Sequence, residues 1–269
     1  MILPKYVLKM EIKVLKESNE NLNFVLKDID YVYVNTLRRI MLSEIPILAI
    51  KSVKFIKNTS ALFDEAIAHR LGLLPLKMSS TYNLTEKCSC KGEGCAKCQS
   101  NITLNCEGPL TVYASDLKFK DPDIKPVHPK IPIVKLHKGQ EMEIEAVVTL
   151  GRGKYHAKYA PGHIYYKGYP KIKIGEKCNN CGECVKECPK NILIIESKKL
   201  KTQNIEDCHL CDACVDICPK DAIEVKSSTK DFIINLESFG NLSSKEILSK
   251  SLEVFDDKLD EFAKELKKI

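Results

Sequence analysis

The chain has 269 residues, of which 44% are hydrophobic and 29% charged, a composition typical of a soluble globular protein with two or three domains. No apolar run approaches the ~20 residues of a membrane span, and lysines interrupt Met1–Val14 too often for a signal peptide, so we expect a cytoplasmic protein that does not bind membranes. The 42 basic and 36 acidic residues leave a net charge of +6, which permits a nucleic-acid neighbour without demanding one.

Alternating apolar and polar residues predict a β-hairpin at the start of the chain. The alternation runs from Leu8 to Val14 and returns from Leu22 to Leu26, after the polar turn Ser18–Asn21. A two-residue period places the apolar side chains of a strand on one face, so we expect this hairpin to be half-buried.

The segment Tyr31–Pro46, YVYVNTLRRIMLSEIP, is predicted to be a helix that Pro46 ends. The adjacent Arg38 and Arg39 lie beside its apolar stripe and suggest a charged partner on one side. Taken alone, the pattern is also that of an ordinary core helix. The stripe has the three- and four-residue spacing of a helix face and consists of Val34, Leu37, Met41 and Ile45.

The C-terminal segment Ser243–Leu266 is predicted to be a longer helix. Ser243 and Glu246 have the spacing of a capping box, which satisfies two backbone amides at a helix start. The apolar residues that follow form a heptad seam, namely Leu248, Leu252, Phe255, Leu259, Phe262 and Leu266. The earlier helix can cover only part of such a seam. We therefore expect the two helices to pack together and leave a remainder for another chain.

The middle of the chain is predicted to be mainly β structure. A second helix should run from a Ser60 cap, through Asp64 and Glu65, to Gly72. The proline-rich stretch Asp121–Pro132 is predicted to be an irregular connector. Strands are expected at Ala49–Ile56, twice within Ile102–Phe119, at Glu141–Leu150 and at Asp231–Glu237.

Thirteen cysteines in a cytoplasmic chain favour metal sites over disulfides, and eight of them form a tandem repeat. Each copy reads C-x2-C-x2-C-x3-C-P, the bacterial ferredoxin signature for a four-iron cluster, in which the fourth cysteine serves the other cluster. We expect two [4Fe-4S] clusters, and the loss of one iron to give a [3Fe-4S] form stays open. The ligands of the first would be Cys178, Cys181, Cys184 and Cys218, and those of the second Cys208, Cys211, Cys214 and Cys188.

A second cysteine group, Cys88, Cys90, Cys95 and Cys98, has four thiols within eleven residues. Four thiolates with no open position suit a structural zinc ion, with a disulfide or unligated thiols as the alternatives. The remaining Cys106 is expected to be a small buried residue. The scattered histidines give no metal-binding pair, Gly151–Gly162 lacks the spacing of a phosphate-binding loop, and we expect no catalytic residue in this chain.

Three segments carry a resemblance: VNTLRRIMLSEIP, ALFDEAIAHRLGLLPL at Ala61–Leu76, and GRGKYHAKYAP at Gly151–Pro161. They resemble the α-like subunits of DNA-directed RNA polymerase, above all the archaeal one, which is similar to the bacterial α subunit and to the eukaryotic third-largest subunit. The resemblance covers nearly the whole chain in matching order. The cysteine loop at Cys88–Cys98 is similar to the zinc loop of the eukaryotic counterpart.

The resemblance implies that the first and last helices dimerise with a second α-like polypeptide of the polymerase, the L subunit. It implies that Ala61–Leu76 and the HAKY segment face the second-largest subunit and the small assembly subunits, with DNA reached only through the complex. The interface residues that we expect are Val34, Leu37, Arg38, Arg39, Met41, Ile45, Leu252, Phe255, Leu259 and Phe262.

We expect an α+β fold with a discontinuous, α-subunit-like dimerisation domain formed by residues 1–50 and 226–269, together with part of 142–176. An inserted β-rich domain would span 51–170 and a ferredoxin-like double-cluster domain 171–225. The function expected is a non-catalytic assembly platform of RNA polymerase. The alternatives are a ferredoxin-type electron carrier or redox-enzyme subunit and, more weakly, a zinc-dependent nucleic-acid-binding module.

Overall fold

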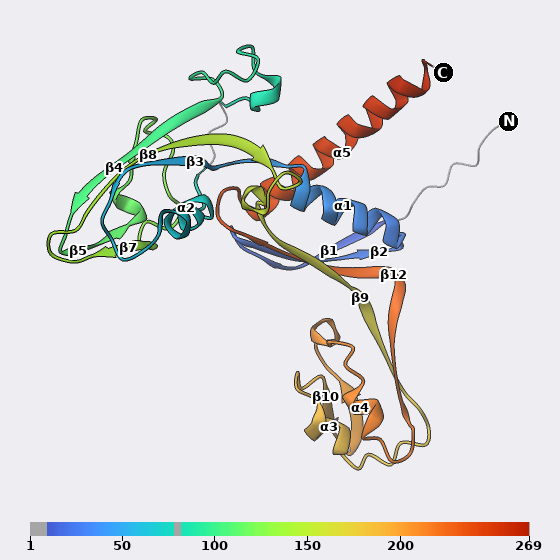
Figure 1. Ribbon diagram of the computed structural model, residues 1–269. Helices are drawn as coiled ribbons and strands as arrows, with labels where there is room; N and C mark the ends of the chain where they lie inside the picture. Colours follow the sequence, from blue (N-terminus) through green and yellow to red (C-terminus); the bar gives the residue numbers. More distant parts are fainter. Residues whose placement is uncertain (1–9, 78–81, 269) are drawn as a thin grey trace. The chain divides into compact units, whose positions relative to one another are not determined.

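The computed structural model describes residues 10–77 and 82–268 (Figure 1). The chain forms two compact units. The first comprises Asn23–Thr36 and Tyr165–Asn235 with the described residues up to Glu17. The second comprises Ser18–Leu22, Leu37–Ile164 and the chain from Leu236. Helices and sheets both contribute, in agreement with the α+β expectation.

A four-stranded sheet contains the predicted hairpin, with the strand order β1-β2-β12-β9. Its strands are β1 at Glu11–Glu17, β2 at Asn21–Lys27, β9 at Gly162–Ile174 and β12 at Ile223–Ser238. The expectation of half burial is wrong for β1, because Ile12 and Val14 are 56% and 51% exposed. The physical reason is that β1 lies at the edge of the sheet, and alternation shows which side chains share a face without showing whether anything covers it. Leu8 lies outside the described residues.

The predicted first helix is α1, Tyr31–Ser43. Val34 and Met41 of its apolar stripe are buried, as is Ile45 just beyond the helix, whereas Leu37 is only partly buried. The helix ends before Pro46, which is the first residue of strand β3. The long strand β3, Pro46–Asn58, includes the predicted strand Ala49–Ile56.

The largest core of the second unit is built on an antiparallel sheet of order β3-β8-β4-β6. Strand β8 is paired with β3 from Pro46↔Arg152 to Asn58↔Met142 and with β4 on its other side. Alternate residues of β8 from Met142 to Leu150 are buried, as the sequence predicted. A second pair is formed by β5 and β7. The bounds are β4 Gln99–Glu107, β5 Leu110–Tyr113, β6 Lys118–Phe119, β7 Pro132–Leu136 and β8 Glu141–Arg152.

Helix α2, Asp64–Gly72, buries Ile67 and Leu71 in this core, but Ser60 is not its cap. The N-cap position is Phe63, which makes no side-chain capping bond. The Ser60 hydroxyl instead donates to Asn58 Oδ1 at 2.7 Å and accepts from the Leu62 amide at 3.3 Å. It thus closes the turn that leads into the helix. The described residues of this unit also form three short 3-10 helices, η1 at Thr85–Lys87, η2 at Ala114–Asp116 and η3 at Ala157–Tyr159.

The tandem cysteine repeat folds into a small module between the ends of β9 and β12 (Figure 1). Each copy leads into a short helix whose N-cap residue, Gly182 or Asp212, has left-handed backbone angles. The module has a small core centred on Cys184, Leu193 and Ile223. Its elements are α3 Glu183–Glu187, β10 Leu193–Glu196, β11 Lys199–Thr202, η4 Ile205–Asp207 and α4 Ala213–Asp216.

The C-terminal helix is α5, Ser244–Leu266, and it begins with the predicted capping box. The Ser243 amide donates to Glu246 Oε2 at 2.7 Å, and the Glu246 amide donates to Ser243 Oγ. The face that the chain buries consists of Ser244, Ile247 and Ser251. None of the helices within the described residues is both long and apolar enough to span a membrane.

Candidate metal centres

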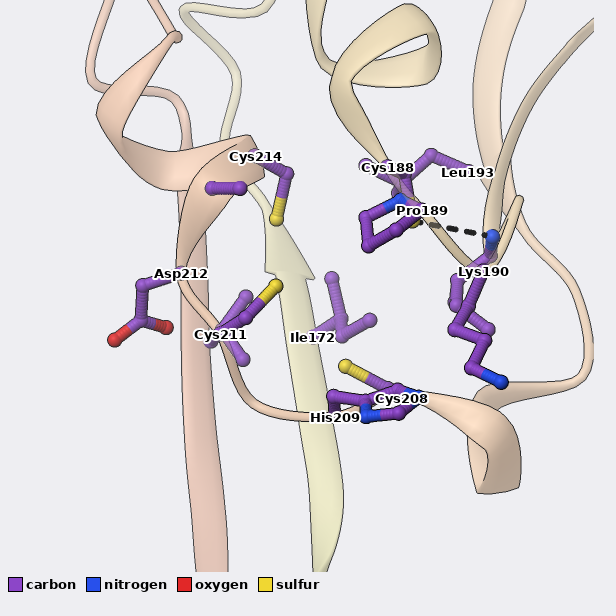
Figure 2. Close-up of a pocket in the computed structure, with 13 residues that line it drawn as sticks. Ile172, Cys188, Pro189, Lys190, Leu193, Cys208, His209, Cys211, Asp212 and Cys214 are labelled. Atoms are coloured by element: carbon purple, nitrogen blue, oxygen red, sulfur yellow. Dashed lines mark hydrogen bonds between the residues drawn. The ribbon is translucent and has the colours of Figure 1, made fainter.

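Four cysteines from the two repeats line one cavity of the small module (Figure 2). Cys208, Cys211 and Cys214 come from the loop that leads into α4, and Cys188 follows α3. Ile172, Leu193 and Val225 supply apolar walls. One cavity therefore receives three thiols from one repeat and the last thiol from the other, the arrangement that a ferredoxin cluster requires.

The remaining four cysteines line a second, equivalent cavity. Cys178, Cys181 and Cys184 lie in the loop before α3, and Cys218 reaches them from the end of the second repeat. In both cavities the sulfur of the crossing cysteine accepts a backbone hydrogen bond from the residue four positions later. The Ala222 amide lies 3.3 Å from Cys218 Sγ, and the Ile192 amide lies 3.4 Å from Cys188 Sγ.

The thiols of these cavities differ in how easily they ionise. Burial raises the pKa of Cys184, and it raises the pKa of Cys214 to about 11. Backbone amides from Ala222 and Lys220 lower the pKa of Cys218. Since a metal binds the thiolate form, iron would supply the positive charge that these buried sulfurs need in order to ionise.

The Cys88–Cys98 loop is built for a single ion. The sulfurs of Cys88, Cys90, Cys95 and Cys98 all lie within 4.8 Å of one another. The Cys88–Cys95 and Cys90–Cys98 separations are both 3.6 Å, and Cys95–Cys98 is 3.9 Å. A tetrahedral site with metal–sulfur bonds of about 2.3 Å has sulfurs about 3.8 Å apart, so the loop fits zinc. Among the residues that the structure describes, no other group of three or more cysteine, histidine or acidic side chains brings its ligand atoms within this distance of one another.

The local backbone explains how this loop gathers its sulfurs. Gly92 and Gly94 have φ values of 93° and 91°, which L side chains rarely adopt. Their amides point at Cys90 and lower its pKa to about 6, whereas burial raises the pKa of Cys98 to about 12. The isolated Cys106 packs against the β-sheet core, as expected of a small residue, but it is only partly buried.

The expected interface residues fall into two groups. Val34, Met41 and Ile45 are buried within the chain and therefore present no surface to a partner. Leu37 and Arg38 are partly exposed, and Arg39 is exposed. On α5, in contrast, the seam is open: Phe255 is partly exposed, and the exposed fractions are 49%, 51%, 63% and 53% for Leu252, Leu259, Phe262 and Leu266.

Two charged residues that the sequence did not single out make several contacts near α5 and near the second cluster loop. Glu44, directly after α1, forms ion pairs with Arg152, Lys154 and Lys258. Lys167, on β9, donates to backbone oxygens of the second-cluster loop. Neither residue lies in a motif, and their partners are distant in sequence, so no local signal could have identified them.

Comparison with known proteins connects the fold and the metal centres to one family. Residues 39–165 match the RNA polymerase Rpb3/RpoA insert domain, and residues 176–223 match a 4Fe-4S dicluster domain. The chain is 40% identical over 261 residues to DNA-directed RNA polymerase subunit Rpo3 of Archaeoglobus fulgidus, covering 96% of this chain and 98% of that protein. The chain is 39% identical over 257 residues to Rpo3 of Methanothermobacter thermautotrophicus, covering 94% of this chain and 97% of that protein. It is 35% identical over 268 residues to Rpo3 of Pyrococcus horikoshii, covering 97% of this chain and 99% of that protein.

The relatives match nearly the whole chain, and the family matches include an insert domain and a dicluster domain. The sequence had predicted both, as an inserted β-rich domain and a ferredoxin-like double-cluster domain. The predicted resemblance to the archaeal α-like subunit and the predicted α+β fold class are confirmed. The chain belongs to the Rpo3 family of DNA-directed RNA polymerase subunits.

Proposed function

We propose that this chain is a non-catalytic assembly platform of the polymerase, and that α5 binds an α-like partner, the L subunit. The observation on which this proposal depends is the exposed seam of α5. Leu252, Leu259 and Phe262 are each about half exposed or more, although they lie on one helical face. Fully burying an exposed apolar side chain of this size contributes about 1.5–3 kcal/mol, and roughly half of that remains to be gained at these half-exposed positions when a second amphipathic helix packs against them.

The exposed seam also has the shape that a helical partner needs. Its residues follow a heptad spacing, so the apolar surface runs almost along the helix axis and shifts by only about 20° per heptad. The buried residues Ser244, Ile247 and Ser251 lie in the first part of α5, and the later part is exposed to solvent. The first turns thus fix the helix to the chain, and the later turns present the seam to the partner.

A second docking surface is proposed for the second-largest subunit and the small assembly subunits. Next to α2, the apolar side chains of Phe63 and Leu73 are 82% and 52% exposed, and Tyr155 in the glycine-rich basic segment is 62% exposed. Lys158 of the HAKY segment lines a cavity with Leu73 and with Phe239, which follows β12. Aromatic side chains such as those of Phe63 and Tyr155 are enriched at protein interfaces relative to the rest of a protein surface. DNA would be reached only through these subunits.

The metal centres are proposed to be structural. The two cavities of the small module would hold two [4Fe-4S] clusters, with a [3Fe-4S] form at one of them still open, and the Cys88–Cys98 loop would hold zinc. The domain division at 1–50 with 226–269, 51–170 and 171–225 remains our proposal, as does the cytoplasmic location. The alternative of an electron carrier is not favoured, because the Rpo3 relatives match the whole chain and not the cluster module alone.

Affinity purification of the tagged chain from its own cells tests this function. We expect the large polymerase subunits and the L subunit to be recovered in comparable amounts. A matched preparation in which Leu259 and Phe262 are replaced by aspartate should lose the L subunit. Recovery of reductases without polymerase subunits would contradict the proposal and favour the electron carrier.

A further inference from the structure

The loop of the second cluster is fastened to strand β9 by a lysine. Lys167 Nζ donates to the backbone oxygen of Glu206 at 2.7 Å and to that of Cys208 at 2.8 Å. Lys167 is itself only partly exposed. One ammonium group therefore holds both ends of the short turn from Glu206 to Cys208, the first ligand of that cluster.

The side chain of Glu206 adds a second attachment to the sheet. Its Oε1 lies 3.5 Å from Lys13 Nζ on β1 and accepts from the Tyr169 hydroxyl at 3.4 Å on β9. The turn before Cys208 is thus held by three side chains from two strands. All of these residues belong to one compact unit of the chain.

The first cluster is held differently. Asn180, which lies between Cys178 and Cys181, accepts a hydrogen bond from the Leu200 amide at 2.8 Å. Leu200 belongs to β11 inside the small module, so this loop is tied to the module itself. The two repeats have the same cysteine spacing but different supports. Asn180 of the first repeat corresponds to Leu210 in the second, which has no side-chain hydrogen-bonding group, and the second loop is instead attached to β9 by Lys167.

We propose that Lys167 is a positioning residue for the second cluster, which it keeps in place by fixing the backbone at Cys208. Figure 2 shows why this matters, because Cys208 lies at one side of the cavity and the sulfurs of Cys208, Cys211 and Cys214 point into it. A cluster needs all four sulfurs at once, so a displaced Cys208 opens one corner of the site. Groups that orient metal ligands from outside the ligand set typically change metal affinity by about 10–100-fold.

The inference rests on the proposed ligation of the clusters, and the test keeps the two apart. In the full chain, Cys181→Ser leaves the second cluster to be measured alone, and Cys211→Ser leaves the first. Lys167→Met is then added to each of these two chains. The measurements are iron content after anaerobic preparation, the rate of iron release to a chelator, and the electron paramagnetic resonance signal of the reduced chain.

We expect Lys167→Met to accelerate iron release about tenfold or more in the Cys181→Ser chain and to leave release from the Cys211→Ser chain unchanged. Lys167→Arg keeps donors on a long side chain and should restore slow release. Lys171→Met is the matched control, because Lys171 lies on the same strand but pairs with Asp231 at 3.4 Å. Equal acceleration in both chains, or none in either, overturns the role of Lys167. Chains that bind no iron before Lys167 is changed would refute the clusters themselves.

Discussion

The carboxylate of Glu44 lies 3.4 Å from the ammonium group of Lys258 on α5. The same side chain, only 15% exposed, also faces Lys154 at 3.5 Å and Arg152 at 3.9 Å. Arg152 in turn lies 3.6 Å from Glu86, two residues before the first cysteine of the zinc-type loop. One carboxylate thus pairs with three cations and connects Lys258 of α5 to residues at the end of β8.

Replacing Glu44 by glutamine should loosen α5, because three cations would then face one another without an acid between them. Exposed ion pairs contribute about 0.2–1 kcal/mol, and removing one partner of a buried pair costs about 3–5 kcal/mol. We expect a loss of about 1–2 kcal/mol here, because Glu44 is mostly buried while its lysine partners are partly exposed. Hydrogen exchange of α5 measures it. Lys258→Met, which removes one cation of three, should cost less, and an equal loss would contradict the shared role of Glu44.

Replacing Leu259 and Phe262 by aspartate should abolish binding of the α-like partner. Both side chains are exposed in this chain, so the variant should fold normally, whereas two unpaired charges would be buried in the complex at a cost of roughly 3–5 kcal/mol or more. Co-purification with the L subunit measures the effect. Glu261→Lys, between the two positions, is the control for a change of charge on this helix. Undiminished binding by the double variant would show that the interface lies elsewhere.

Local spacing in the sequence was enough to predict the elements that build these sites. The heptad seam, the Ser243–Glu246 capping box and the two ferredoxin repeats are all patterns over a few residues, and each depends on backbone geometry that neighbouring residues determine. For the same reason, the β8 alternation predicted its buried face correctly.

Features that depend on distant residues could not be predicted in the same way. The burial of Ile12 depends on whether another element covers β1, and the contact between Glu44 and Lys258 depends on the path of the whole chain between them. Ser60 shows a different limit, because its hydroxyl has two good local partners and the turn before α2 uses it instead of the helix.

The Cys88–Cys98 loop should bind one zinc ion per chain. X-ray absorption should show a metal surrounded by four sulfurs, and Cys90→Ser should release the metal because the ion would keep only three thiolates. Cys106→Ser is the matched control, since Cys106 is not part of the group of four. Zinc absent from a preparation in which the four thiols remain reduced would contradict the assignment.

The capping box should stabilise α5 in a pH-dependent way. The Ser243 amide and hydroxyl donate to Glu246 and lower its pKa below the ordinary value of 4.5. A lowered pKa means that the stabilisation is complete above pH 4.5 and is lost as the pH falls through the lower value in the helix. In a peptide of residues 240–269, circular dichroism should show less helix for Glu246→Gln at pH 7 and no difference at pH 2. Ser243→Ala should cost about 0.5–2 kcal/mol.

The clusters should act by holding the small module folded and should take no part in nucleotide addition. That reaction transfers a nucleotidyl group to the RNA 3′-hydroxyl and releases pyrophosphate. No oxidation state changes, so the reaction needs no redox centre. A module of this size buries little core, and its folding should depend on ligation of the thiolates. Replacing Cys181 and Cys211 by serine should therefore raise hydrogen exchange across residues 177–225 and weaken polymerase assembly.

The elongation rate of polymerase that has already assembled can distinguish a structural role of the clusters from a redox role. We expect the same elongation rate with the clusters oxidised and with the clusters reduced, provided that iron analysis shows them intact in both states. The physical reason is that a change of one electron alters the charge of a cluster but leaves its four sulfur ligands, and hence the fold of the module, in place. The double serine variant, assembled at low temperature, controls for cluster loss. A large and reversible change of rate with redox state would refute a purely structural role and would indicate redox control of transcription.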